Sequence, residues 1–282
     1  MNTNLNKKEL LMPKIDVVFH ALFREENKEL TESLISDILG EPVKLKTTDL
    51  SRHLNIKTAE QKLGIMDLRT ELEDGSKCNI EVQLGMHKNE TNRFLFYWAD
   101  AYSRQLARGN EYGALNKTIS IIILDHEIEE QKGIEELDIK WQIKDNKTGK
   151  RLLTEDLEII IVEIPKAIKQ YKKNMQNKIC QWMMFLDNPN KKEMKEIMVE
   201  NEKIKEAVEE LEAMSDDEEL RRIADLRLKA ERDEKSRMLY AEEKGKTERN
   251  IEIAKKMLLK KVPIEEVIEI TGLTKEEIEK LK

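Results

Sequence analysis

The clearest pattern in the chain is an alternation of apolar and polar residues between Gly64 and Leu84. Alternation with a period of two is typical of strands, because successive side chains of a strand point to opposite faces. The pair Asp74-Gly75 interrupts it, and this dipeptide favours the tight turn of a hairpin. The stretch therefore predicts two antiparallel strands. Their apolar residues are Ile65, Leu68, Leu72, Ile80, Val82 and Leu84.

Helical spacing of apolar residues appears on both sides of this hairpin. Residues 15–23 predict a short helix, and residues 28–39 predict a longer one that Gly40 is placed to end. Residues 92–108 predict a helix with an aromatic stripe. Further strands are predicted at residues 42–50, 118–124, 139–143 and 157–164. The order helix–strand–strand–strand–helix–strand indicates an α/β fold, an α+β arrangement around a mixed sheet.

Helix-forming residues dominate the chain beyond Pro165. Apolar spacing over residues 168–186 predicts a helix that packs back on the preceding domain. Residues 191–246 combine many Lys and Glu residues with few apolar ones. This composition predicts a solvated helix or helical pair, with a coil that pairs two copies of the chain as the alternative. Residues 250–282 have the spacing of a helix-turn-helix around Gly272.

The second helix of this last segment is expected to begin after Thr274, which would cap it. Its polar positions carry more carboxylates than lysines, and phosphates repel carboxylates. We therefore expect a small packing module rather than a helix that contacts DNA bases. The polar positions are Lys275, Glu276, Glu277, Glu279 and Lys280.

Three polar residues interrupt the apolar pattern of the central hairpin: Asp67, Glu81 and Gln83. A carboxylate in a mostly apolar strand is costly to bury without a partner. Glu81 and Gln83 share one face of their strand because they are two residues apart. In a three-residue loop, Gly75 adopts the positive φ that the turn needs, and Asp67 then lies opposite Glu81.

This register decides whether the hairpin can bind a metal. Facing residues have Cβ atoms about 4.5–5.5 Å apart, so two facing carboxylates repel each other unless they are protonated or bridged by a cation. A hard divalent ion, which takes oxygen ligands, would bridge them. A two-residue loop would instead set Asp67 against Val82 and separate the two carboxylates. The sequence leaves both registers open.

Composition narrows the choice of partners and compartment. The net charge of −7 gives no general attraction to nucleic acid, so DNA binding requires a local basic patch or a bound cation. Cys78 and Cys180 are far apart and form no CxxC pair, which favours a reducing cytoplasmic compartment over a zinc site or disulfides. The apolar runs at residues 119–124 and 159–164 are too short to cross a bilayer. The N-terminal residues lack the apolar region of a signal peptide.

Three ordered blocks of sequence carry a family resemblance. They read KIDVVFHALF from Lys14, IMDLRTELEDGSKCNIEVQ from Ile65, and RFLFYWADAYSRQLARGNEYGAL from Arg93. In the second block, Asp67 followed by Glu81-Val82-Gln83 looks like the D…(E)xK signature of the PD-(D/E)XK nuclease superfamily, with Gln in the Lys position. More narrowly, the blocks resemble the Rpn family of recombination-promoting nucleases, also described as transposases. The resemblance implies a restriction-endonuclease-like αβββαβ core followed by a mostly helical C-terminal region.

The resemblance also implies an activity, which is metal-dependent hydrolysis of DNA phosphodiester bonds by an endonuclease. Asp67 and Glu81 would hold Mg²⁺ or Mn²⁺, and Gln83 would be the third catalytic residue. The ion would polarise a phosphate oxygen and activate a bound water. Gln83 can orient the water by hydrogen bonds but brings no charge, so a slow or strongly metal-dependent activity is expected.

Four further residues are weaker site candidates. In the superfamily an acidic residue of the first helix often joins the metal site, which suggests Glu32, with an ordinary solvated glutamate as the alternative. Asp16 suits the N-terminal cap of its helix better than a catalytic role. Arg93 and Gln105 are polar residues of the aromatic helix that could contact phosphates.

We expect four segments: a polar lead at 1–12, a nuclease-like domain at 13–188, a charged helical region at 189–246 and a C-terminal module at 247–282. DNA is the expected partner, and the helical C-terminal region is where a homo-oligomer would form. Two other interpretations stay open. One is a nuclease fold that is catalytically weak or inactive and serves DNA binding or assembly. The other is a structural protein whose helical tail carries the function.

Overall fold

The structure is a computed structural model that describes residues 9–50, 67–86, 88–107 and 109–281, with residues 47–50 and 67 given by their backbone alone. The chain divides into two compact units, Met1–Leu228 and Lys229–Lys282. Most of the expected polar lead and the polar connection before the hairpin lie outside the described residues.

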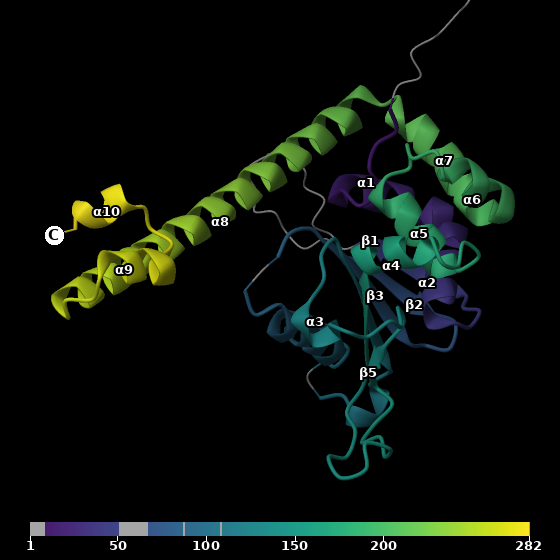
Figure 1. Cartoon of the computed structure of the whole chain (residues 1–282). Helices are drawn as coiled ribbons and strands as arrows, with labels where there is room; N and C mark the ends of the chain where they lie inside the picture. The colour runs from purple at the N-terminus through teal and green to yellow at the C-terminus, as the bar shows by residue number, and fades with distance from the viewer. Residues whose placement is uncertain (1–8, 51–66, 87, 108, 282) are drawn as a thin grey trace, which may run out of the picture. The chain divides into compact units, whose positions relative to one another are not determined.

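A mixed sheet forms the centre of the first unit (Figure 1). Within the described residues its strands follow the order β1-β2-β3-β4-β6-β5. Strands β3, β4 and β6 run parallel to one another, whereas the other neighbours pair antiparallel. The strands are β1 (Leu45–Leu50), β2 (Asp67–Leu72), β3 (Lys77–Gln83), β4 (Thr118–Leu124), β5 (Lys140–Trp141) and β6 (Leu157–Glu163). The αβββαβ order of the superfamily core is therefore present as α2, β1, β2, β3, α3 and β4.

Helices cover both faces of this sheet, which explains why every residue of β4 is buried. One face packs against α1 (Asp16–Leu22), α2 (Lys28–Leu39), α4 (Ile164–Tyr171) and α5 (Lys178–Asp187). The other face carries a smaller core in which Phe94 of α3 (Glu90–Ser103) packs against Ile122 and Ile161. Figure 1 shows α3 apart from the group of α2, α4 and α5. The two faces therefore present different side chains of each strand to different helices.

Several helix boundaries differ from the sequence prediction. Helix α3 ends at Ser103, earlier than residue 108. The single helix expected at 168–186 is two helices, because the chain leaves the helical conformation after Tyr171 and restarts at Lys178. Asn177 begins the second helix, since its side chain accepts a hydrogen bond from the Cys180 backbone N–H at 3.0 Å.

The charged region after Pro189 contributes to the main core, which corrects the expectation that it is merely solvated. It contains α6 (Met194–Glu200), α7 (Glu202–Ser215) and the first turns of α8 (Glu218–Leu259). The apolar residues are few, but they gather on one face of each helix. The residues that join the main core are Met194, Ile197, Ile204, Ala207, Val208, Leu211 and Ala224.

The second unit has its own small core, formed by the later turns of α8 together with α9 (Ile264–Thr271) and α10 (Lys275–Glu279). Gly272 ends α9 with φ of 66°, as the predicted turn requires. Thr274 caps α10 in a capping box with Glu277. The predicted helix-turn-helix is thus present, with Val267 and Ile278 buried in its core. In the part of the chain that the structure describes, no helix is both long and apolar enough to cross a membrane.

Candidate active site

The β2–β3 hairpin has the register that sets Asp67 directly opposite Glu81. Its loop contains three residues, because the backbone N–H of Leu72 donates to the carbonyl of Ser76 at 2.9 Å. Gly75 lies within this loop with φ of 87°, a conformation that glycine adopts without strain. The alternative pairing of Asp67 with Val82 is therefore wrong. The backbone places these two acidic residues at facing positions.

Glu81 and Gln83 lie on the α3 side of the sheet and are 2% and 3% exposed. The guanidinium of Arg93, from the second turn of α3, lies 3.4 Å from Oε1 of Glu81. Arg93 also lies over the ring of Tyr97, with 5.7 Å between its central carbon and the ring centroid. This cation offsets part of the cost of burying the Glu81 carboxylate. The structure thus brings three of the candidates together, namely Glu81, Gln83 and Arg93.

A hydrogen-bonded chain of side chains continues from Gln83. Its Nε2 donates to Oε1 of Glu90 at 3.0 Å, and Glu90 in turn lies 3.0 Å from Nε2 of His126 through Oε2. The other ring nitrogen of His126 lies 2.9 Å from Oδ1 of Asp125. Glu90 begins α3, whereas Asp125 and His126 directly follow β4. These hydrogen-bonded side chains therefore join the end of β3 to the end of β4 through the start of α3.

The charges of His126, Asp125 and Glu90 stabilise one another. Burial alone would lower the pKa of His126, but its hydrogen bonds to Asp125 and Glu90 outweigh burial, and the net pKa is raised. Burial would likewise raise the pKa of Asp125, but the hydrogen bonds from His126 and from the Gly85 backbone N–H hold it below its ordinary value. An imidazolium between two carboxylates is the form that these shifts favour.

Sequence reasoning missed Glu90, Asp125 and His126. One signal for two of them was available, since Asp125 and His126 come directly after a strand that is apolar on both faces. The carboxyl ends of parallel strands meet at one edge of a sheet, where α/β proteins place their ligands. Glu90 carried no comparable signal, because an acidic residue in the first turn of a helix is common for its favourable interaction with the helix dipole.

Oδ1 of Asn79, Oε1 of Gln83 and Oγ of Ser120 are buried on this face and have no hydrogen-bond partner among the described residues. Asn79 and Ser120 occupy facing positions of β3 and β4. The facing positions of Asp67 and Glu81 carry carboxylates, the hard oxygen donors that Mg²⁺ or Mn²⁺ prefers. The residues therefore fit a divalent ion. The described residues contain no cluster of three or more His, Cys, Asp or Glu with metal-binding geometry.

The other sequence candidates make contacts elsewhere. Glu32 accepts hydrogen bonds from the Leu45 backbone N–H at 2.9 Å and from Lys44 at 2.7 Å, which ties α2 to β1. It is buried rather than solvated. The N-terminal cap of α1 is Ile15, so Asp16 is not the cap. Asp16 instead pairs with Arg227 at 3.3 Å.

Gln105 also has contacts within the fold. Its Nε2 donates to Oγ1 of Thr118 at 2.8 Å and to the carbonyl of Asn116 at 3.1 Å. Its Oε1 accepts from the Asn116 backbone N–H at 2.9 Å. These bonds fasten the end of α3 to the start of β4. A contact with phosphate stays a prediction for Gln105.

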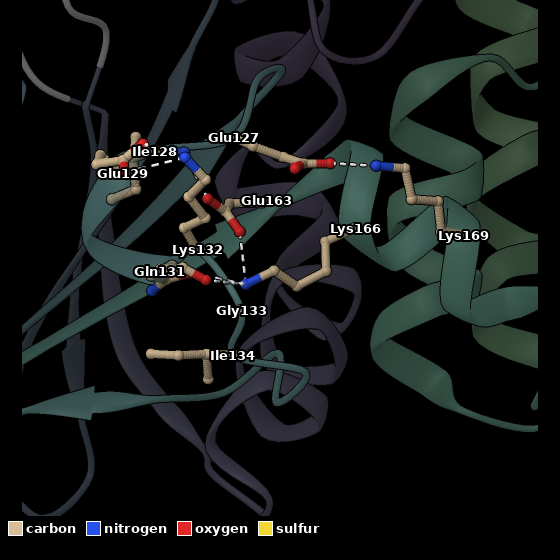
Figure 2. A pocket seen from close by; sticks show the side chains of 10 residues that line it. All are labelled: Glu127, Ile128, Glu129, Gln131, Lys132, Gly133, Ile134, Glu163, Lys166 and Lys169. Carbon is tan, nitrogen blue, oxygen red and sulfur yellow. Dashed lines mark hydrogen bonds and ion pairs between the residues drawn. The ribbon is translucent and has the colours of Figure 1, made fainter.

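A pocket of about 290 Å³ lies between the segment after β4 and the start of α4 (Figure 2). Its lining begins at Glu127, the residue that follows His126 in the sequence. Each lysine that lines it is paired with a glutamate of the same pocket. Lys166 lies 2.6 Å from Glu163, Lys169 lies 2.5 Å from Glu127, and Lys132 lies 3.1 Å from Glu129. Because the three pairs balance in charge, the pocket has no preference for an anion such as phosphate.

The sheet topology and the hairpin register define the class of protein, which is a PD-(D/E)XK nuclease fold. A family model described as PD-(D/E)XK nuclease family transposase matches residues 13–241, more than half of the chain. A second model, described as Rpn/YhgA-like nuclease family, C-terminal HTH domain, matches residues 247–282. The chain belongs to the Rpn family of PD-(D/E)XK nuclease-like transposases. Searches of curated proteins and of solved structures gave no significant match.

Proposed function

We propose that the protein is a metal-dependent DNA endonuclease that hydrolyses phosphodiester bonds. The observation that carries this proposal is the hairpin register, which sets Asp67 opposite Glu81 with Gln83 on the same side of β3. A nuclease-like function follows from the family. The family's description as a transposase supports a role in DNA recombination or in the movement of genetic elements.

Asp67 and Glu81 would hold Mg²⁺ or Mn²⁺, together with a backbone carbonyl of the Glu81–Gln83 segment. When bound, the ion supplies Lewis-acid polarisation of a phosphate oxygen and lowers the pKa of a bound water. Gln83 orients the attacking water through its amide. Arg93 balances the buried Glu81 charge and stands where it can also offset charge on a phosphate.

DNA binding is supported by local positive charge, since the chain as a whole is acidic. In the first unit, residues 144–151 between β5 and β6 carry four basic residues and one acid. That acid, Asp145, accepts hydrogen bonds from the Thr148 hydroxyl and from the backbone N–H groups of Arg151, Thr148 and Lys147, which hold its pKa well below the usual range. The exposed cations are Lys144, Lys147, Lys150 and Arg151. Such a loop suits contact with phosphates.

The second unit offers a further basic surface. Lys255, Lys260 and Lys261 lie exposed at the end of α8 and in the turn that follows, whereas Lys256 pairs with Glu252 of the same helix. The family description of this region as an HTH domain supports DNA binding by it, against the packing role that its acidic second helix predicts. We propose that the lysines at the end of α8 contact the DNA backbone. A homo-oligomer formed through the helical C-terminal region remains part of the proposal.

A cytoplasmic location is also proposed. Cys78 and Cys180 are free and buried, and burial raises the pKa of the Cys78 thiol to about 12. Such thiols are unreactive and suit a reducing compartment.

The second candidate is a nuclease fold with little or no catalysis that binds DNA or assembles with other copies. Two observations favour it. Gln83 stands where related nucleases have lysine, and Arg93 already supplies a positive charge at Glu81. A divalent ion would have to bind beside that charge, which opposes it.

A plasmid-nicking assay with Mg²⁺, with Mn²⁺ and with a chelator tests the proposal. We expect supercoiled DNA to be nicked only with metal, and Asp67→Asn and Glu81→Gln to lose at least about a hundredfold in rate, since a metal supplies several kcal/mol to such reactions. The matched control is Glu71→Gln. Glu71 belongs to the same hairpin and pairs with Lys46 and Lys77. Wild-type rates in both site variants would show that cleavage, if present, uses another site.

A further inference from the structure

The residues that follow Gln83 form a closed network around the end of β3. Side-chain bonds lead from Gln83 through Glu90 and His126 to Asp125. The return path uses the backbone. Asp125 accepts a hydrogen bond from the Gly85 N–H at 2.8 Å and donates its own N–H to the carbonyl of Gln83 at 3.3 Å. Both ends of the chain of side chains are therefore fixed to the same three residues, 83–85.

The chemistry of these groups decides which atom donates in each bond. The carboxylates of Glu90 and Asp125 accept hydrogen bonds, so His126 between them donates from both ring nitrogens. Only the imidazolium form can do so. The raised pKa of His126 agrees with this, because its hydrogen bonds to Asp125 and Glu90 outweigh the lowering effect of burial.

The same reasoning orients the amide of Gln83. Because the Glu90 carboxylate accepts, the group that Gln83 turns toward it is the NH₂. The amide oxygen is then turned away from Glu90. That oxygen is buried and has no hydrogen-bond partner among the described residues. A buried acceptor without a partner costs free energy, which a ligand with a hydrogen to donate would recover.

We propose that Glu90 and His126 are positioning residues that hold Gln83 with its amide oxygen presented as a hydrogen-bond acceptor to the attacking water. The proposal rests on the proposed hydrolytic function and specifies how this chain works without the lysine of related nucleases. A lysine at this position donates hydrogen bonds, whereas Gln83 held in this way accepts one from the water O–H. It orients a lone pair of the water toward the phosphorus and takes no proton, because an amide is not a base at neutral pH.

Other charges near His126 act on the same network. Glu90 faces it from α3, and Asp125 faces it from the segment after β4. Lys14 helps to hold the pKa of Asp125 low. A purely structural role, in which the network only ties β3, α3 and β4 together, would leave the catalytic pH dependence independent of His126. Two experiments separate these roles.

The first experiment follows the imidazole ¹⁵N signals of the full-length, metal-free protein by NMR across pH, with His126→Asn to assign the resonances. We expect both His126 nitrogens to be protonated at pH 7 and Glu90→Gln to lower the pH of its titration. Glu129→Gln is the matched control, because Glu129 lies in the same loop and pairs with Lys132. A neutral His126 at pH 7 would overturn the proposed orientation, whatever the protein does to DNA.

The second experiment measures metal-dependent nicking against pH. We expect Glu90→Gln to lower kcat by about a hundredfold, the scale of a misplaced catalytic group, with metal affinity and KM for DNA nearly unchanged. The wild type should lose activity as pH rises through the His126 titration seen by NMR, and His126→Asn should lack that alkaline loss. Wild-type kcat in Glu90→Gln, while Glu81→Gln is inactive, would overturn the positioning role alone. A wild-type protein that never cuts DNA would overturn the proposed function and this role with it.

Discussion

The guanidinium of Arg93 lies 3.4 Å from the carboxylate of Glu81, so a residue proposed to hold a divalent cation already has a fixed cation beside it. The two positive charges compete for the same oxygen. At the same time Arg93 reduces the repulsion that the facing acidic residues would otherwise feel in the absence of metal. This one contact therefore acts in opposite directions on metal affinity and on the stability of the metal-free protein.

Arg93→Gln should therefore bind Mg²⁺ or Mn²⁺ more tightly, by about tenfold, because unit charges this close repel by more than about 1 kcal/mol even near a protein surface. Isothermal titration calorimetry of wild type and variant measures the change. Arg104→Gln is the control, since Arg104 belongs to the same helix and pairs with Asp100. Weaker metal binding in Arg93→Gln would contradict the competition between the two cations.

Removing either facing carboxylate should change the stability of the metal-free protein, but with different signs. Asp67→Asn relieves repulsion and should raise the free energy of unfolding by about 1 kcal/mol. Glu81→Gln relieves the same repulsion but leaves the half-buried Arg93 without this charge partner, which costs about 1–3 kcal/mol. Denaturant unfolding in the presence of a chelator measures both values. Equal shifts in the two variants would argue against the contact between Arg93 and Glu81.

The stabilisation that His126 provides should depend on pH. Its pKa in the folded protein is raised above the ordinary 6.5, so its contribution is fully present below about pH 6.5 and is lost as pH rises through the folded pKa. The difference in unfolding free energy between wild type and His126→Asn should thus be larger at pH 6 than at pH 9. Urea titrations at the two values measure it. A difference that grows toward pH 9 would mean that His126 is buried in its neutral form.

Charge removal in the loop at residues 144–151 should weaken DNA binding in a salt-dependent way. Replacing Lys147, Lys150 and Arg151 by Gln should reduce the slope of log affinity against log salt by about 0.9 for each phosphate that the loop no longer neutralises. Fluorescence anisotropy with duplex DNA at several salt concentrations measures the slope. Lys205→Gln with Arg222→Gln is the control, because both cations pair with glutamates on their own helices. An unchanged slope would remove this loop from the interface.

The position of a truncation should decide whether the nuclease unit folds. A chain that ends at Leu228 retains the residues of α6, α7 and early α8 that join the main core. A chain that ends at residue 190 loses several large buried side chains, each worth about 1.5–3 kcal/mol, against a typical domain stability of about 5–15 kcal/mol. We expect cooperative thermal unfolding, seen by circular dichroism, only for the longer chain. A cooperative transition in both would contradict the role of α6 and α7.

The sequence predicted those features that depend on neighbouring residues or on strong local patterns. The two strands and the turn at Gly75 followed from strand alternation and from the Asp-Gly pair, which narrowed the partner of Asp67 to Glu81 or Val82, and the structure decides for Glu81. The cap at Thr274 was also predicted, and the structure adds the reciprocal bond from Glu277 that makes it a capping box. In both cases the determining residues are only a few positions apart, or are joined by a single tight loop.

Features that require tertiary order were missed. The network from Gln83 to His126 joins residues that meet only after β3 and β4 pair in parallel, and no local pattern reports that pairing. The contribution of α7 to the core was also missed, because Ile204 and Leu211 are diluted among charged residues that lie on the other faces of the helix. Composition averaged over a segment hides a narrow apolar face.

The three-residue loop of the β2–β3 hairpin also affects how this site can change during evolution. Deleting one loop residue would turn every side chain of β2 to the opposite face of the sheet. Asp67 would then face the main core under α1, α2, α4 and α5, and Leu68 would leave that core. Leu68 is fully buried, so that slip exposes a core leucine and buries a carboxylate. Loss of the acidic pair by a change of loop length is thus penalised as a folding defect. Relatives that lose the acidic pair should therefore keep the loop length and substitute Asp67 or Glu81 directly.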